Sequence, residues 1–409
     1  MEHKGLVIRS VGLLRSDSSV MLRLLPFAVA SLLPAALLAL ACFFGGFWAW
    51  AGIAAITVVV FFLDKLSVAP DISDATGHRL SEVLGLVHFG LLGLAVWAMG
   101  GPLPLFDKVL IVIGSGLYFG QISNSNAHEL IHRASRWPFR MGAANYTSIL
   151  FGHHTSAHRL VHHVHAGTRR DPSTARLGEG FWTYLIRAWA GSFRAGLQAE
   201  RNRHGGARWP VPYVAYTVGG MLALLAAFGL GGNAGVVGLI VIAGYAQIQL
   251  MLSDYVQHYG LERRVLADGN PERMGPQHSW NAPHWYSSAM MLNAPRHSAH
   301  HMQPAKPFPG LELTRGEMPI LPQSLPVMAV IALVPPLWRR LMDKRVAAWR
   351  APNVQNAAGT ARAIREKLVS GGISGPVLPH SPHAKNRPAA AVFPDRANGA
   401  GRTDDGGRI

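Results

Sequence analysis

The sequence has a single cysteine and few charged residues, and each scarcity excludes a class of protein. Cys42 has no partner in the chain, which excludes an internal disulfide, a four-cysteine zinc ribbon and a cysteine-ligated iron–sulfur cluster. Only 15% of the 409 residues are charged, whereas a soluble protein carries about 25%. Together with 49% hydrophobic residues, this composition indicates a membrane protein whose redox partner is a separate chain.

Long apolar stretches predict six membrane-spanning helices. A hydrocarbon core of about 30 Å requires roughly 20 mostly apolar residues in helical form. Gly45 and Gly46 alone separate the first two stretches, and a glycine-rich turn near Gly232 separates the last two, so each pair is predicted to form a hairpin. The six stretches are residues 22–44, 47–63, 83–99, 110–122, 211–230 and 236–252.

The distribution of basic residues predicts the orientation. If the amino terminus is cytoplasmic, Lys108 is the only one of the 38 Lys and Arg residues on the outer side, as the positive-inside rule requires. This topology accounts for the net charge of +16 and leaves little support for nucleic-acid binding, the other interpretation of a basic chain. We therefore expect contact with membrane lipid and no nucleic-acid partner.

Composition divides the chain into three parts. Residues 1–20 are predicted to form a cytoplasmic segment and residues 21–350 a membrane domain with a cytoplasmic cap. Residues 351–409 contain little apolar surface and are predicted to be a disordered basic tail. The apolar stretch 319–338 contains five prolines, so we expect an interfacial or buried segment there and no seventh span.

Four clusters of histidine are the most distinctive feature. On a helix, residues three or four apart lie on one face, so each multiple cluster is predicted to converge on a common point. The clustered residues are His128, His132, His158, His162, His163, His258, His297, His300 and His301. Among the 20 histidines, His153, His154, His165, His278 and His284 lie nearby without a repeated spacing, and the rest, including His88 and His204, are assigned no role.

The predicted topology places all four clusters on the cytoplasmic side, including His258 at the inner end of the last span. Nine imidazoles exceed the three or four ligands of one zinc ion, so two metal ions are predicted. Imidazole binds iron, zinc, copper and nickel, so the ligand type leaves the metal open. The alternative that the histidines only occupy the membrane interface suits one pair better than four spaced clusters.

Two other functional classes stay open. Residues 128–132 match the HExxH pattern of zinc peptidases, in which the glutamate is the general base. That interpretation needs one further ligand and leaves the other clusters without a role. A metal transporter would place ionisable groups within its spans, whereas these histidines lie at one end.

The four clusters resemble the boxes of the membrane alkane monooxygenases (alkane hydroxylases), within the membrane fatty acid desaturases and hydroxylases. HELxHK is similar to residues 128–133, EHxxxHH to 157–163, NYxEHYG to 254–260 and QRHSxHH to 295–301. Residues 168–172, 278–281, 335–338 and 342–343 resemble the family's TPxDP, HSWN, PPLW and MD segments. Ala157, Asp254, Gln257 and Ala299 depart from these boxes, which puts the substrate in doubt more than the metal site.

The resemblance implies O2-dependent hydroxylation of the terminal methyl group of an alkane or similar hydrophobic compound. It implies two non-haem iron ions with the nine clustered histidines as ligands, and it makes Glu129 and Asp171 candidates for orienting those ligands, with helix capping or salt bridging as the alternative role. A membrane fatty acid desaturase or an aromatic methyl hydroxylase with the same iron site stays an alternative.

The same resemblance implies partners and a location. Electrons would come from a separate rubredoxin or ferredoxin-type protein with its NAD(P)H-dependent reductase. The expected architecture is an all-α integral membrane protein with six transmembrane helices and a cytoplasmic di-iron site, in a bacterial inner membrane with both termini cytoplasmic. Substrate would enter through the bilayer, along a channel that Trp48, Trp50, Phe61, Phe62 and Trp97 could wall, although lipid contact is the simpler role for each of them.

Overall fold

The computed structural model describes residues 5–65 and 74–351, and in these ranges the protein is helical, with three isolated β-bridges as its β-structure. The predicted tail lies outside the described residues except for Ala351. The α-helices are α1 (Gly5–Phe44), α2 (Gly46–Ile56), α3 (Val58–Leu63), α4 (Asp74–Gly100), α5 (Leu105–Tyr118), α6 (Asn124–Ile131), α7 (Arg136–Ser148), α8 (His154–Ala157), α9 (His163–His165), α10 (Phe181–Arg203), α11 (Val211–His258), α12 (Trp285–Met290), α13 (His297–Met302) and α14 (Leu325–Ala332). There are also two π-helices, η1 (Phe119–Ser123) and η2 (His158–His162), and two 3₁₀ turns, η3 (Pro276–His278) and η4 (Phe308–Gly310). Residues 335–351 form a further helical stretch after α14.

Five helical stretches are long and apolar enough to cross a membrane. They are Leu24–Phe44, Gly46–Leu63, Gly77–Gly100, Leu105–Ile131 and Val211–His258. The first two meet at Gly45, whose φ of 61° a side chain would strain, and this confirms the hairpin predicted there. The stretch 319–338 yields α14, which has eight residues and is too short to span.

The fifth stretch, α11, reverses its direction at a glycine. Gly232 has φ 59° and ψ −150°, outside helical geometry. A Cβ on Gly235 would lie 2.5 Å from the carbonyl oxygen of Ala227, although a straight helix separates residues eight apart by about 12 Å. The two halves of α11 are therefore antiparallel, as the glycine-rich sequence predicts.

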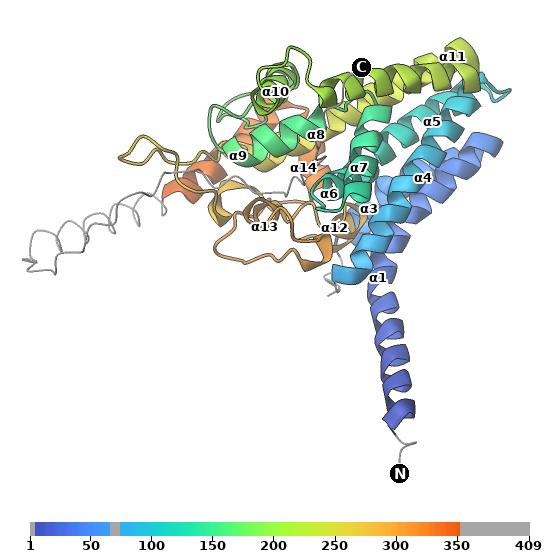
Figure 1. Ribbon diagram of the computed structural model, residues 1–409, viewed down its shortest axis with the longest axis horizontal. Helices are drawn as coiled ribbons and strands as arrows, with labels where there is room; N and C mark the ends of the chain where they lie inside the picture. The colour runs from blue at the N-terminus through green and yellow to red at the C-terminus, as the bar shows by residue number, and fades with distance from the viewer. Residues whose placement is uncertain (1–4, 66–73, 352–409) are drawn as a thin grey trace, which may run out of the picture. The chain divides into compact units, whose positions relative to one another are not determined.

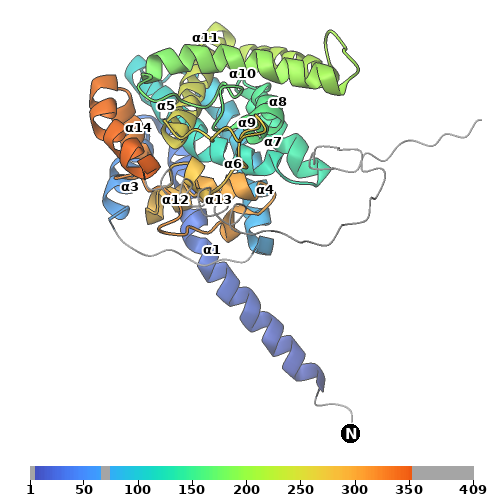
Figure 2. The ribbon, with the colours of Figure 1, turned by 90° about the vertical axis from the view of Figure 1, so that its left-hand side faces the viewer.

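Helix α4 lies at the centre of the packing. It contacts α1, α5, α6, α7 and α11, and Figure 1 shows it beside α1 and α5. Small residues permit the close approach: a Cβ on Gly85 would meet Met141 of α7. The helices that carry the histidine clusters, α6, α9 and α13, lie beside one another in both Figure 1 and Figure 2.

Candidate metal centre

The structure brings the nine clustered histidines together in two adjacent groups. They come from the end of α6, from η2 and the start of α9, from the last residue of α11, and from α13. The five-histidine group is His128, His132, His158, His163 and His300, and the four-histidine group is His162, His258, His297 and His301. Within each group the candidate ligand atoms lie within 4.8 Å of one another.

The spacing of the ring nitrogens fits metal ligation better than hydrogen bonding. In the four-histidine group the Nε2 atoms of His258, His297 and His301 form a triangle with sides of 2.9, 3.1 and 3.2 Å. Each Nε2 has one hydrogen or one lone pair, so it cannot form hydrogen bonds with two neighbouring nitrogens at once. Nitrogens bonded at about 2.1 Å to one ion and at right angles to each other would be about 3 Å apart.

The five-histidine group has the same spacing. The Nε2 atom of His158 lies 2.8 Å from that of His128 and 2.9 Å from that of His163. The Nε2 atom of His163 lies 3.0 Å from that of His300. The Nε2 atom of His132 is buried and has no hydrogen-bond partner among the described residues, and the same holds for His162 in the other group. An imidazole nitrogen left unpaired in this way is available to a metal ion.

One part of the sequence prediction is wrong: helical spacing assigned His158 and His162 to one point, and the structure puts them in different groups. The cause is η2, a π-helical turn over His158–His162. Its i→i+5 hydrogen bonding widens the turn, so residues five apart lie nearer to one face than they do in an α-helix, and His158 shares a group with His163. In α13, His300 likewise separates from His297 and His301.

Burial keeps most of these imidazoles neutral. Desolvation, followed by the charges of neighbouring histidines, holds the pKa values of His132, His158, His163, His300 and His301 well below their usual range. A neutral imidazole retains the lone pair that a metal ion requires. These five imidazoles therefore keep the lone pairs that metal ligation requires.

Asp171 orients one of the clustered histidines. Its Oδ2 atom lies 2.9 Å from Nδ1 of His162 and accepts a hydrogen bond of 2.7 Å from the hydroxyl of Thr174. Burial opposes protonation of His162, but the charge and hydrogen bond of Asp171 outweigh the effect of burial and raise the pKa of His162. A carboxylate on Nδ1 leaves Nε2 free to face the group, which is the arrangement that supports metal-bound histidines.

Glu129, the other candidate carboxylate, has a different setting. It forms a buried ion pair with Arg133 and accepts a hydrogen bond of 3.1 Å from the backbone N–H of Phe308. These contacts join α6 to η4. They give Glu129 the salt-bridging role that the sequence left open, and they offer no support for a general base of the zinc-peptidase type.

The shorter motifs hold the histidine-bearing helices in place. Asn281 accepts a hydrogen bond of 2.9 Å from the N–H of Ser298 and donates one of 2.8 Å to its hydroxyl, which anchors α13. Tyr259, next to His258, donates a hydrogen bond of 2.6 Å to Asp343. The ring of Trp338 packs on Tyr259 with 5.3 Å between centroids. The resemblance identified these segments, but their supporting contacts are visible only in the structure.

The departures from the family boxes are accommodated by packing. Where the second box usually opens with an acid, Ala157 lies against α10, and a Cβ on Gly196 would lie 3.1 Å from Ala157. Gln257 donates a hydrogen bond of 3.1 Å to the carbonyl oxygen of Ala294. Asp254 is buried and lines a cavity of about 30 Å³ with His128 and other residues. The sequence pattern marks Asp254 only as a departure from the third box.

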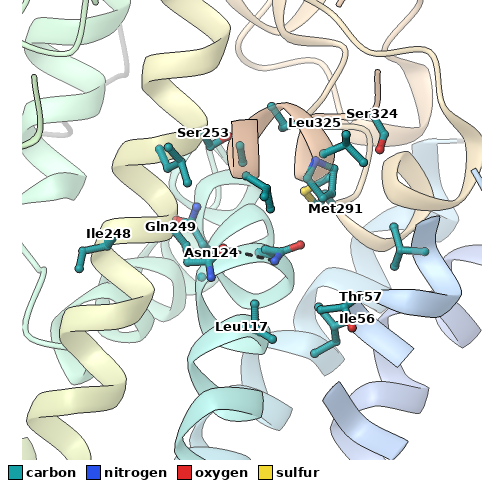
Figure 3. Close-up of a pocket in the computed structure, with 18 of the residues that line it drawn as sticks. Ile56, Thr57, Leu117, Asn124, Ile248, Gln249, Ser253, Met291, Ser324 and Leu325 are labelled. Atoms are coloured by element: carbon teal, nitrogen blue, oxygen red, sulfur yellow. Dashed lines mark hydrogen bonds between the residues drawn. The ribbon is translucent and has the colours of Figure 1, made fainter. Parts of the chain in front are cut away.

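A larger cavity of about 440 Å³ lies among the spans, within the range of about 300–1,000 Å³ typical of ligand sites. Figure 3 shows Ile56 of α2, Leu117 of α5, Ile248 of α11 and Leu325 of α14 around it. It shares three lining residues with the smaller cavity of about 30 Å³: Asn124, Ser125 and Ser253. The smaller cavity is also lined by His128, His158 and His297, so it touches both histidine groups and adjoins the apolar cavity.

The aromatic residues suggested from the sequence as channel walls contribute less than expected. Phe61 lines the 440 Å³ cavity. Trp50 and Phe62 are more than half exposed and Trp97 is 40% exposed, which suits the alternative role of lipid contact.

Comparison with known proteins places this arrangement in a family. The model of the fatty acid desaturase family matches residues 102–331. Alkane 1-monooxygenase 1 of Alcanivorax borkumensis is 30% identical over 69% of this chain and 71% of its own length. Alkane 1-monooxygenase of Acinetobacter baylyi is 33% identical over 59% of this chain and 60% of its own length. The xylene/toluene monooxygenase hydroxylase component of Pseudomonas putida is 27% identical over 74% of this chain and 83% of its own length.

The residues that the family model matches include all four histidine clusters, and the relatives agree with the resemblance carried by the boxes. The chain therefore belongs to the fatty acid desaturase family and, within it, to the alkane monooxygenases.

Proposed function

We propose that this protein is an integral membrane monooxygenase that hydroxylates the terminal methyl group of alkanes and similar hydrophobic compounds. One observation carries the proposal: an apolar cavity among the spans shares wall residues with a small cavity that histidines of both groups line. The reaction consumes R–CH3, O2, two electrons and two protons and yields R–CH2OH and H2O. The xylene/toluene monooxygenase relative extends the substrate class to methyl groups on other hydrophobic compounds.

The proposed cofactors are two non-haem iron ions, one in each histidine group. The five-histidine group and the four-histidine group supply only imidazole donors, and Asp171 fixes the ring of His162. Bound iron supplies the oxidising power that breaks an inert C–H bond in the presence of O2. The protein holds the imidazoles in register and buries most of them away from water.

The cavity orients the substrate. Apolar walls such as Ile56, Leu117 and Leu325 exclude water and bind an alkyl chain by burial. Asn124 and Ser253 line both cavities and therefore stand between the alkyl-chain cavity and the histidines. An alkyl chain in the larger cavity therefore directs its terminal methyl group towards His128, His158 and His297.

The proposal includes a topology and an electron source. Because the two halves of α11 are antiparallel, we count them as two membrane crossings, which makes six crossings in all. With six crossings, both termini and the histidine groups lie in the cytoplasm. The spans lie in the inner membrane of a bacterium. A single cysteine cannot ligate an iron–sulfur centre. A separate rubredoxin or ferredoxin-type protein, with its NAD(P)H-dependent reductase, supplies the electrons.

Product analysis tests this function. Membranes that contain the protein and an electron-donor system are supplied with medium-length n-alkanes, fatty acids and xylenes, and the products are identified by mass spectrometry. We expect primary alcohols. His258→Ala is expected to abolish their formation and to lower the iron content, while the protein still inserts into the membrane. His204→Ala, in a surface contact with Glu200, is the matched control and retains both. Unsaturated acyl chains as the sole product would contradict the proposal.

A further inference from the structure

A buried histidine inside a membrane-spanning helix has no role in the site described above. His88 of α4 is 1% exposed. Its Nδ1 atom lies 2.5 Å from the hydroxyl oxygen of Ser123, and its Nε2 atom lies 2.7 Å from that of Ser148. Ionisable residues within spans are costly and rare, and they mark functional positions.

The ring of His88 contacts both ends of the π-helical turn η1. Ser123 is the last residue of η1, and Phe119 is the first. The rings of His88 and Phe119 meet edge to face, with 4.9 Å between centroids. Ser148, the third contact, ends α7. His88 therefore bridges η1 from end to end and ties it to α7.

Two further hydrogen bonds extend this contact along α4. Asn126 of α6 donates one of 2.9 Å to the carbonyl oxygen of Ser81, and Asn145 of α7 donates one of 3.1 Å to that of Gly85. Positions 81, 85 and 88 are three or four residues apart and so lie on one face of α4. This polar face holds η1, α6 and α7. One turn before Ser81 on α4, the guanidinium group of Arg133, just after α6, donates a further hydrogen bond of 3.2 Å to His78.

The π turn determines where the first histidine cluster points. From η1 the chain continues directly into α6, which carries His128 and ends beside His132. A π turn holds one residue more than an α turn, and one residue corresponds to a rotation of about 100° about the helix axis. If η1 relaxed to α-helical geometry, His128 and His132 would turn away from His158 by about that angle.

We propose that His88 is a positioning residue for the five-histidine group. By its contacts with Ser123, Phe119 and Ser148 it holds η1 in the π conformation, and thereby fixes the rotation of His128 and His132. The proposal rests on the proposed function only in requiring that this group bind a metal ion.

Cobalt(II) binding to the purified protein in detergent tests the proposal without measuring activity. Wild type is expected to bind two ions, and His301→Ala identifies the signal of the four-histidine group. His88→Phe keeps a ring but removes both hydrogen bonds. We expect it to weaken cobalt binding at the five-histidine group by about 10–100-fold, the loss typical of changed ligand support, and to alter that ion's d–d absorption. The four-histidine signal stays unchanged, and His88→Gln, which can donate and accept, restores part of the affinity.

Ser123→Ala provides a milder variant in case His88→Phe does not fold. It removes one hydrogen bond and is expected to shift the same cobalt signal. The matched control is Ser31→Ala, because the buried Ser31 hydroxyl donates only within its own helix, to the carbonyl oxygens of Phe27 and Ala28. Wild-type affinity and spectra in both His88→Phe and Ser123→Ala would overturn the proposal, even with a lower unfolding temperature, since that would show packing alone. Absence of cobalt binding in wild type would overturn the proposed function as well.

Discussion

His158 and His163 are five residues apart, and their Nε2 atoms lie 2.9 Å apart within one histidine group. In an α-helix residues five apart point about 140° away from each other. The π turn η2 brings the two rings together and directs His162, between them, to the other group. Neighbouring residues in the sequence thereby belong to different histidine groups.

Alanine substitutions at these neighbours therefore affect different ions. We expect His162→Ala and His163→Ala each to lower the metal content from two ions to about one, because each removes one imidazole from a different group. Mössbauer spectra of iron-57 protein should lose different components in the two variants, and His258→Ala should match His162→Ala. Loss of the same component in His162→Ala and His163→Ala would contradict the division into two groups.

Asp171→Asn is predicted to weaken one metal position selectively. The neutral amide replaces the charge that orients and polarises the His162 ring, and loss of such support lowers metal affinity by about 10–100-fold. Iron content after dialysis against a weak chelator measures the effect, which should fall on the His162 group. Asp268→Asn is the control, because Asp268 lies on an exposed loop and bonds only to Asn270. Equal iron retention in both variants would contradict a supporting role for Asp171.

The 440 Å³ cavity predicts a chain-length effect. Ala329 of α14 lines it, and Trp at this position would occupy space that an alkyl chain needs. We expect Ala329→Trp to shift the preferred n-alkane to a shorter length and to lower conversion of the longest substrate at least tenfold. Ala226→Trp, on the exposed face of α11, should leave the length profile unchanged. An unaltered profile in Ala329→Trp would show that substrate does not use this cavity.

Glu272 predicts a pH dependence of stability outside the membrane. Burial opposes its ionisation, but hydrogen bonds from Arg264 and His278 outweigh it and lower the pKa of Glu272 to about 2, against about 4.3 in an unfolded chain. Since the pKa of Glu272 is lower in the folded protein, its ionised carboxylate stabilises the folded state. This stabilisation is complete above about pH 4.3 and is lost as the pH falls towards 2. The difference in unfolding temperature between wild type and Glu272→Gln should be constant from pH 7 to 5 and shrink below pH 4. Glu312→Gln, a control at a largely exposed pair with Lys306, should show little difference at any pH. A difference for Glu272→Gln that persists unchanged to pH 3 would contradict this assignment.

Much of the fold and of the candidate site could be predicted from the sequence, because the signals were local. Apolar length and the glycines at 45 and 232 marked the spans and hairpins, and histidine spacing marked the clusters. The division of the histidines could not be predicted, since α-helical periodicity does not reveal a π turn such as η2. The role of His88 was also hidden, because Ser123 and Ser148 lie 35 and 60 residues away and meet it only after folding.

Metal analysis of the purified wild-type protein tests the central claim most directly. The two histidine groups, each complete in the structure, predict close to two iron ions per chain, with two distinct Mössbauer components and little zinc. One zinc ion per chain and no iron, in protein purified from iron-replete cells and active as isolated, would contradict a di-iron monooxygenase.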